Sequence, residues 1–196
     1  MVLGEVMDAT ALIMERFQVV DDPGPLPLRA QAGDRTALAQ LFAELGFNAG
    51  AEIGVNMGRF SKHLLAANPN LHMRLVDPWP TRGKYRNAIE RLARYGERAE
   101  FIRQYSVDAV KDVEDESLDF VYIDALHDYD SAMMDIISWT PKVRRGGIVS
   151  GHDYMQYERI GVIAAVNAYT QAHRIDPWFI TWEVVTPSSH SWFWVR

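Results

Sequence analysis

The 196-residue sequence contains no cysteine, and this absence removes several classes of protein at once. Disulfide-stapled scaffolds, thiolate zinc sites, iron–sulfur clusters and cysteine nucleophiles all require that side chain. A compact chain of this length buries about 70% of its unfolded surface, so it can build a core without covalent staples. The sequence therefore indicates one domain, or one domain with a small appendage.

The sequence also lacks a basic surplus and long apolar runs. Its 20 Lys and Arg residues stand against 26 Asp and Glu residues, which gives a net charge of −6. Because nucleic-acid binding needs a basic surface, nucleic acid is not expected as the main partner. No apolar run approaches the roughly 18 residues that span a bilayer, and the start of the chain has no basic segment or apolar core typical of a signal peptide. We expect no membrane partner and a cytoplasmic location.

Prolines are few, but three of the nine lie within residues 23–27 and interrupt the pattern of the chain. Three prolines this close together cannot continue a helix or a central strand. Before them, apolar residues recur at helical spacing over residues 8–19, and after them a second helix is expected to begin at Asp34 as its N-cap. We assign residues 1–33 to a helix and connector that form a cap or lid, and residues 34–196 to the main domain.

From residue 49 onward, short apolar runs alternate with helical periodicities. The expected strands are 49–53, 71–76, 100–103, 118–123 and 147–150, and the expected helices are 59–67, 84–95, 107–113, 130–139 and 158–172. The strand at 118–123 is almost wholly apolar, which is typical of a strand buried on both faces of a parallel sheet. Alternation with short connections predicts a doubly wound α/β sheet.

The end of the chain breaks this alternation. Two β-rich aromatic runs, 178–185 and 191–195, are separated by only five residues. No helix fits between them, so we expect the two strands to pair antiparallel.

A glycine-containing turn follows the first strand of the alternation. Gly54 permits a sharp backbone turn and Gly58 permits close approach of a ligand, while the helix that starts there offers N–H groups to an anion. The spacing is G-x-x-x-G after Glu52, not the G-x-G-x-x-G that brings pyrophosphate close to the backbone. Asp77 ends the second strand, where an acid can accept both hydroxyls of a ribose. The alternatives are a glycine turn that serves packing only and an Asp that caps the turn before Pro78.

The segment E-I-G-V-N-M-G from Glu52 to Gly58, the segment V-D-P-W from Val76 to Trp79 and the terminal hairpin resemble the class I S-adenosylmethionine-dependent methyltransferases. The resemblance covers about residues 47–196. It implies a three-layer, Rossmann-like doubly wound sheet of seven strands with the last strand antiparallel, preceded here by N-terminal helices.

The resemblance also implies which residues hold S-adenosylmethionine. Glu52 and Gly54 are expected beside the methionine part of the cofactor, and Asp77 is expected on the ribose. Trp79 is expected near the adenine, with Ser106 at the polar edge of that ring. The full set of expected cofactor residues is Glu52, Gly54, Asn56, Gly58, Asp77, Trp79, Ser106 and Asp124.

Polar side chains follow the fourth and fifth expected strands, in D-A-L-H-D-Y from residue 124 and G-G-I-V-S-G-H-D-Y from residue 146. These segments resemble the small O-methyltransferases of the catechol and macrocin type, which often require a divalent metal. A hydroxyl acceptor must lose a proton, either to a general base or to solvent after a metal has lowered its pKa. The expected catalytic residues are Asp124, His127 and His152, with His127 as the base, and the expected ligands of Mg²⁺ or Mn²⁺ are Asp124, His152 and Asp153.

Other roles for these four residues stay open at this point. His127 is also placed to bond the backbone at a helix start. Asp124 can orient the acceptor without a metal, His152 can bond the backbone, and Asp153 can cap the next helix. An imidazole among the ligands also shifts the preference from Mg²⁺ towards Mn²⁺, Fe²⁺ or Zn²⁺.

The sequence therefore predicts O-methylation of a small hydroxylated acceptor, such as a sugar, a phenol or a natural product. The Asn/Asp-Pro-Pro-Tyr motif of many N-methyltransferases is absent. Two alternatives are a non-catalytic cofactor-binding module and, against the glycine spacing, a nicotinamide-dependent oxidoreductase. Few residues lie outside the sheet core, which suits a compact acceptor or a site completed by a neighbouring subunit of a homo-oligomer.

Overall fold

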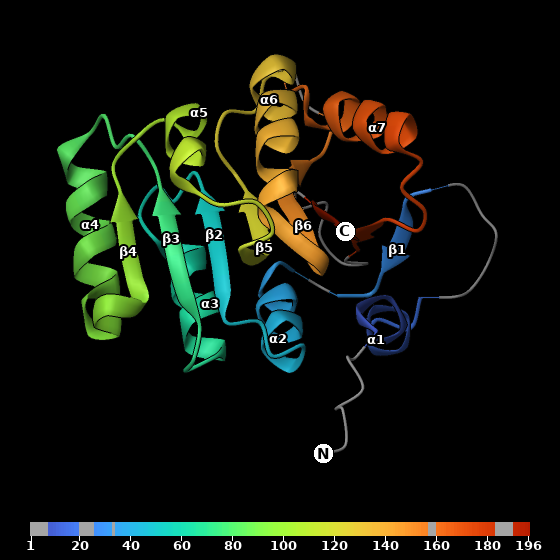
Figure 1. Ribbon diagram of the computed structural model, residues 1–196, viewed down its shortest axis with the longest axis horizontal. Helices are drawn as coiled ribbons and strands as arrows, with labels where there is room; N and C mark the ends of the chain where they lie inside the picture. Colours follow the sequence, from blue (N-terminus) through green and yellow to red (C-terminus); the bar gives the residue numbers. More distant parts are fainter. Residues whose placement is uncertain (1–7, 20–25, 33, 157–159, 183–189) are drawn as a thin grey trace.

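A computed structural model describes residues 8–19, 26–32, 34–156, 160–182 and 190–196, which fold around one mixed sheet (Figure 1). The strands are β1 Leu28–Ala30, β2 Ala49–Ile53, β3 His72–Val76, β4 Ala99–Ile102, β5 Leu118–Ile123, β6 Val143–Tyr154, β7 Phe179–Thr181 and β8 His190–Val195. They lie in the order β1-β7-β8-β6-β5-β2-β3-β4. Strand β8 runs antiparallel to both of its neighbours, and the other strands share one direction. The doubly wound sheet with an antiparallel last strand is thereby confirmed.

Helices cover both faces of this sheet, which makes the three layers (Figure 1). They are α1 Ala9–Arg16, α2 Thr36–Glu44, α3 Arg59–Ala67, α4 Arg82–Leu92, α5 Ser106–Ala109, α6 Tyr129–Trp139 and α7 Val162–His173, with 3₁₀ turns at Ala93–Arg98, Val110–Asp112 and Thr140–Lys142. Among the described helices, none has the length and apolarity that crossing a bilayer requires.

Each central strand divides its side chains between two apolar clusters. In β5, Phe120 and Tyr122 join the cluster of α1 to α4, while Val121 and Ile123 join the cluster of α5 to α7. This division follows from the two-residue period of a strand, because successive side chains point to opposite faces. The near-continuous apolar sequence of β5 is therefore needed to fill both cores.

The N-terminal region contributes more to the sheet than its prolines indicate. Leu28–Ala30 pairs parallel with Phe179–Thr181 and adds an eighth strand, where seven were predicted. Proline beside a three-residue strand is tolerated because β1 lies at the edge of the sheet. In α1, Ile13 and the following Phe17 are buried in the core. The role of residues 1–33 as a cap or lid stays a prediction.

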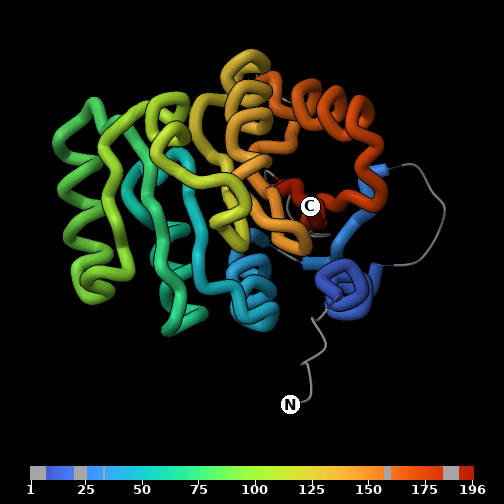
Figure 2. Tube along the Cα trace, viewed as in Figure 1, coloured from blue at the N-terminus to red at the C-terminus, as the bar shows by residue number. Residues whose placement is uncertain are grey.

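The C-terminal strands form a wider structure than the predicted hairpin. Strand β8 pairs with β7 on one side and β6 on the other, so the last residues of the described chain lie inside the sheet (Figure 2). Residues 183–185 of the predicted strand 178–185, and residues 158–159 of the predicted helix 158–172, lie outside the described residues.

Strand register brings three separate segments to one edge of the sheet. Ile53 of β2 pairs with Ile123 of β5, and Ile123 pairs with Gly151 of β6. The next residues along these strands are Gly54, Asp124 and His152. From β2 the chain continues to β3 on one side, and from β5 it continues to β6 on the other side. The carboxyl ends of β2 and β5 therefore flank the switch point at which open α/β sheets bind ligands.

The aromatic contact between the N-terminal helix and the last strand gives a test of the fold. Phe193 is fully buried, with its ring 5.2 Å from that of Phe179 and 6.4 Å from that of Phe17. We expect Phe193→Ala to lower the free energy of unfolding by about 3–5 kcal/mol, measured by urea denaturation, because it leaves a cavity between two elements. Ile137→Ala, at a side chain that is 50% exposed, is the control and should change it by less than about 0.5 kcal/mol.

Candidate active site

The turn after β2 requires glycine at its first position. Gly54 has a φ of +92°, and a Cβ there would lie 2.1 Å from the carbonyl oxygen of Asp124. Its N–H donates to the carbonyl of Val76 at 2.9 Å, which ties the turn to β3. Both the backbone angle and the close approach therefore exclude a side chain at this position. Gly58, with a φ of +68°, begins the helix that follows.

Asp77 connects the glycine turn with the segment after β3. Its Oδ2 accepts the N–H of Asn56 at 2.8 Å, and its Oδ1 accepts the N–H of Trp79 at 2.7 Å. In the structure Asp77 therefore caps the turn before Pro78, which was the alternative to a ribose-binding role. A carboxylate has further lone pairs beyond these two bonds, so its predicted contact with a ribose stays open.

Two residues that were expected near the adenine have other surroundings. Trp79 is fully buried between Tyr85 and Phe101, and its Nε1–H donates to the carbonyl of Asn56 at 2.7 Å. Its indole presents no exposed face to an adenine, because burying this large apolar ring in the core is more favourable. Its expected place near the adenine stays a prediction. Through its bond to Asn56, Trp79 ties the segment after β3 to the glycine turn.

Ser106 lies at the contact between α5 and α6. Its Oγ donates to Oδ1 of Asp135 at 2.5 Å and accepts the Nε1–H of Trp139 at 2.7 Å. Burial raises the pKa of Asp135 to about 6. These bonds hold the segment after β4 against α6. The hydroxyl of Ser106 already contacts two protein groups, and its predicted position at the polar edge of the adenine stays a prediction.

A small cavity lies beside the glycine turn. Its volume is about 150 Å³, and its lining includes four of the expected cofactor residues, Glu52, Gly54, Asn56 and Asp124. Glu52 is 2% exposed and accepts a hydrogen bond from the hydroxyl of Ser61. Burial, with a smaller contribution from the negative charge of Asp124, raises the pKa of Glu52 to about 8. A carboxyl group with this pKa can donate or accept a hydrogen bond near neutral pH.

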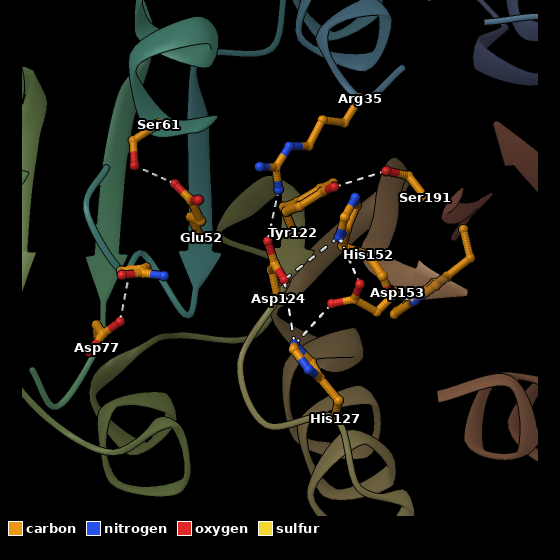
Figure 3. Close-up of polar contacts among 12 residues, drawn as sticks. Arg35, Glu52, Ser61, Asp77, Tyr122, Asp124, His127, His152, Asp153 and Ser191 are labelled. Carbon is orange, nitrogen blue, oxygen red and sulfur yellow. Dashed lines mark hydrogen bonds and ion pairs between the residues drawn. The ribbon is translucent and has the colours of Figure 1, made fainter. Parts of the chain in front are cut away.

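The structure brings together the four polar residues that follow β5 and end β6 (Figure 3). Nε2 of His127 lies 2.9 Å from Oδ2 of Asp153 and 3.7 Å from Oδ1 of Asp124. Nδ1 of His152 lies 3.3 Å from Oδ1 of Asp153 and 3.9 Å from Oδ1 of Asp124. Asp124, His152 and Asp153 each offer a ligand atom, and these atoms lie within 4.8 Å of one another.

An irregularity in β6 lets two consecutive residues face the same cluster. The pairing of β6 with β8 shifts register between Gly151 and Tyr154, and Asp153 has a φ of +57°. In a regular strand, His152 and Asp153 would point to opposite faces, and bulges beside active sites commonly redirect a side chain in this way. The alternative role of Asp153 as a helix cap does not hold, since Gly161 precedes α7 and no side chain caps it.

The charge of His127 is set by its two carboxylate neighbours. The neighbouring carboxylates of Asp124 and Asp153 raise the pKa of His127 to about 10. At neutral pH the imidazole is therefore protonated in this arrangement, and its single positive charge offsets part of the negative charge of the two carboxylates. To act as a general base, it must first lose the proton that it already carries.

Arg35 is the residue of this site that the sequence analysis missed. From the turn before α2, its Nη1 donates to Oδ2 of Asp124 at 2.9 Å, and its guanidinium lies 5.2 Å from the ring centre of Phe60. Tyr122, beside it, is buried with its hydroxyl 2.8 Å from Oγ of Ser191, and burial raises the pKa of Tyr122. No motif marks Arg35, whose only signal is its place next to Asp34.

The raised pKa of Glu52 predicts a pH-dependent cost to stability. Its folded pKa of about 8 lies above the ordinary value of 4.5, so between these values the folded state keeps a proton that the unfolded state has lost. Stability then falls as the pH rises through this range. We expect Glu52→Gln to be more stable than wild type at pH 8.5 by about 1 kcal/mol or more, or about 2–4 °C in Tm per kcal/mol, with the difference shrinking at pH 5. Glu100→Gln, at an exposed carboxylate, is the control, and a pH-independent difference for Glu52→Gln would contradict the prediction.

Comparisons with known proteins agree with this geometry. A family model described as a methyltransferase domain matches residues 51–154. No curated protein matches the chain. Among solved structures, the O-methyltransferase TomG from Streptomyces achromogenes, involved in tomaymycin synthesis and in complex with SAM, has a TM-score of 0.63 at 18% identity, over 98% of this chain and 90% of TomG.

Two further structures share the fold. Cofactor-bound Rv0187 from MTB has a TM-score of 0.64 at 18% identity, over 96% of this chain and 88% of Rv0187. The N-methyltransferase NodS from Bradyrhizobium japonicum WM9 has a TM-score of 0.59 at 12% identity, over 83% of this chain and 94% of NodS. Because the family model covers more than half of the chain, from β2 to the end of β6, the chain belongs to the methyltransferase domain family and is a class I S-adenosylmethionine-dependent methyltransferase.

Proposed function

We propose that the protein transfers a methyl group to a hydroxyl oxygen of a small acceptor. The observation that carries this proposal is the cluster of Asp124, His127, His152 and Asp153 directly beside the cavity of the glycine turn. Methyl transfer to oxygen needs removal of a proton from the acceptor, and carboxylates and imidazoles are the groups that perform or assist this step. The compact acceptor, the absence of a nucleic-acid partner, the homo-oligomer and the cytoplasmic location all remain predictions from the sequence.

The cofactor-binding roles follow from the residues around the glycine turn. When bound, S-adenosylmethionine supplies a methyl group on a positively charged sulfur. Glu52 and Gly54 line the cavity that would receive its methionine part, and Asp77 lies across the turn with lone pairs available to a ribose. Asp124 lines the same cavity and contacts the histidine cluster. One residue thus connects the cofactor cavity with the groups that would handle the acceptor proton.

Proton removal would depend on the balance of contacts around His127. Its high pKa comes from the contacts with Asp124 and Asp153. Both contacts involve the same ring atom, Nε2, at 2.9 Å from Asp153 and 3.7 Å from Asp124. The imidazolium would first release its Nε2 proton to solvent, and the acceptor hydroxyl would then donate its own proton to the neutral Nε2 as the oxygen takes the methyl group.

The donor set also fits a divalent cation. Asp124, His152 and Asp153 would hold it, since their ligand atoms lie within 4.8 Å of one another. A bound cation would lower the pKa of an acceptor hydroxyl. Two carboxylates with an imidazole suit Mn²⁺ better than Mg²⁺, which prefers oxygen ligands alone. Arg35 and His127 already contact oxygens of the same carboxylates, so these two residues would have to share or yield their contacts.

The role of His127 is tested by removing its imidazole. We expect His127→Ala to lower kcat about a hundredfold or more and to leave the affinity for S-adenosylhomocysteine nearly unchanged, as the loss of one general base does. Turnover is measured on a panel of small phenols and sugars, and affinity by calorimetry. His72→Ala, at an exposed histidine that begins β3, is the matched control. A His127→Ala protein with wild-type kcat would show that the histidine is structural, and cofactor binding without turnover in the wild type would favour a non-catalytic module.

The metal is tested by its removal. If a cation acts at Asp124, His152 and Asp153, exhaustive EDTA treatment should abolish turnover, and Mn²⁺ or Mg²⁺ should restore it. Asp153→Asn should then raise the Mn²⁺ concentration that half-restores activity, without weakening binding of S-adenosylhomocysteine. Full activity in excess EDTA would rule out the metal and leave proton removal to His127 and its carboxylates.

A further inference from the structure

A second cavity adjoins the cofactor cavity on the side of the histidine cluster. Its volume is about 330 Å³, and it shares Arg35, Arg59 and Phe60 with the smaller cavity beside the glycine turn. His152 of the histidine cluster forms part of its wall. Volumes of this order hold small ligands. A molecule in this cavity would therefore lie next to both the cofactor position and the groups that handle the acceptor proton.

The walls of this second cavity are mainly basic. Arg35, Arg59, His63 and His152 line it, and Asp34 is its one acidic residue. Oδ1 of Asp34 is engaged locally, because it accepts the N–H of Thr36 at 2.7 Å and the hydroxyl of the same residue at 2.5 Å. The cavity therefore offers more positive than negative charge to a ligand.

The positive groups differ in whether a carboxylate already balances them. Arg35 is paired with Asp124 at 2.9 Å. Within the ranges that the structure describes, neither Arg59 nor His63 forms an ion pair, and both side chains are exposed at the start of α3. They lie four residues apart on one helix, so they occupy the same helical face. Arg59 is therefore the unbalanced positive charge of this wall, and His63 adds a ring N–H donor on the same helical face.

Further basic residues lie near His152, away from the cofactor. Burial, together with the positive charges of Arg29 and His152, lowers the pKa of His190. His190 stacks on Trp182 at 5.0 Å, and the guanidinium of Arg29 lies 4.0 Å from the centre of the Trp182 ring. Arg29 of β1 thus adds a positive charge on the acceptor side, and among the described residues no carboxylate is paired with it.

We infer, on the basis of the proposed methyl transfer to oxygen, that the acceptor carries an anionic group, a carboxylate or a phosphate, which binds Arg59 and His63 while its hydroxyl faces His152 and Asp124. The planar guanidinium of Arg59 matches both anions, since it can donate two parallel hydrogen bonds to two oxygens. The α3 wall then fixes one end of the acceptor, and the histidine cluster acts on the other end.

Matched pairs of probes test this preference without requiring turnover. Calorimetry on protein saturated with S-adenosylhomocysteine compares 3,4-dihydroxybenzoate with 3,4-dihydroxybenzamide, and glucose 6-phosphate with glucose. We expect the charged member of at least one pair to bind about tenfold or more tightly than its neutral partner. The two pairs decide between a carboxylate and a phosphate. Arg59→Gln and His63→Gln should each reduce the difference, whereas Arg86→Gln, an exposed residue on α4, should leave it unchanged.

The outcomes separate this inference from the proposed function. Equal binding within both pairs, or no binding of either charged probe, would overturn the anionic acceptor. An Arg59→Gln protein that loses affinity for S-adenosylhomocysteine and keeps the charge preference would also overturn it, because Arg59 would then serve the cofactor. Tight binding of a charged probe without methylation of its hydroxyl would keep the anion preference and count against O-methylation. Equal methylation of charged and neutral probes would support O-methylation and count against the anion preference.

Discussion

The backbone contact between the end of β2 and the end of β5 is the constraint on which the rest of the site depends. The N–H of Asp124 donates to the carbonyl of Ile53 at 2.7 Å, and Gly54 leaves no room for a Cβ against the carbonyl of Asp124. This contact places the Asp124 side chain at the wall of the cavity beside the glycine turn. On the other side of β5, its pairing with β6 brings His152 and Asp153 within reach of Asp124.

Charge balance explains how so many ionisable groups can share this edge of the sheet. Partly buried carboxylates destabilise a fold unless cations and hydrogen bonds compensate them. Arg35 contacts Asp124, His127 contacts Asp153, and Glu52 stays largely protonated near neutral pH because burial raises its pKa. Each compensating group is also one that a cofactor, a cation or an acceptor could replace. A ligand that replaces these contacts would also change the pKa values of the groups that it releases.

The N-terminal part of the chain forms part of the wall of the second cavity. The family match begins at residue 51, yet Arg35 reaches Asp124 from the turn before α2, and Asp34 to Thr36 line the second cavity. Strand β1 adds Arg29 beside Trp182 and His190. The segment that the family model matches supplies the glycine turn and the histidine cluster. The groups that we propose to bind the acceptor come from outside that segment and from the exposed positions Arg59 and His63 within it.

The sequence by itself determined the alternation of strands and helices, the antiparallel last strand and the glycine at the β2 turn. It also indicated that Asp124, His152 and Asp153 are neighbours. These features follow from the periodicity of each segment and from the order of the segments along the chain, which can both be read locally. Tertiary structure alone decided the rest. Strand β1 became an edge strand by pairing with a strand about 150 residues later, and the Arg35–Asp124 bond joins residues 89 positions apart. The burial of Trp79, the bulge that turns His152 and Asp153 to one side, and the protonated state of His127 all depend on which side chains surround a residue. Those surroundings arise only when distant segments pack together, and local sequence patterns carry no record of them.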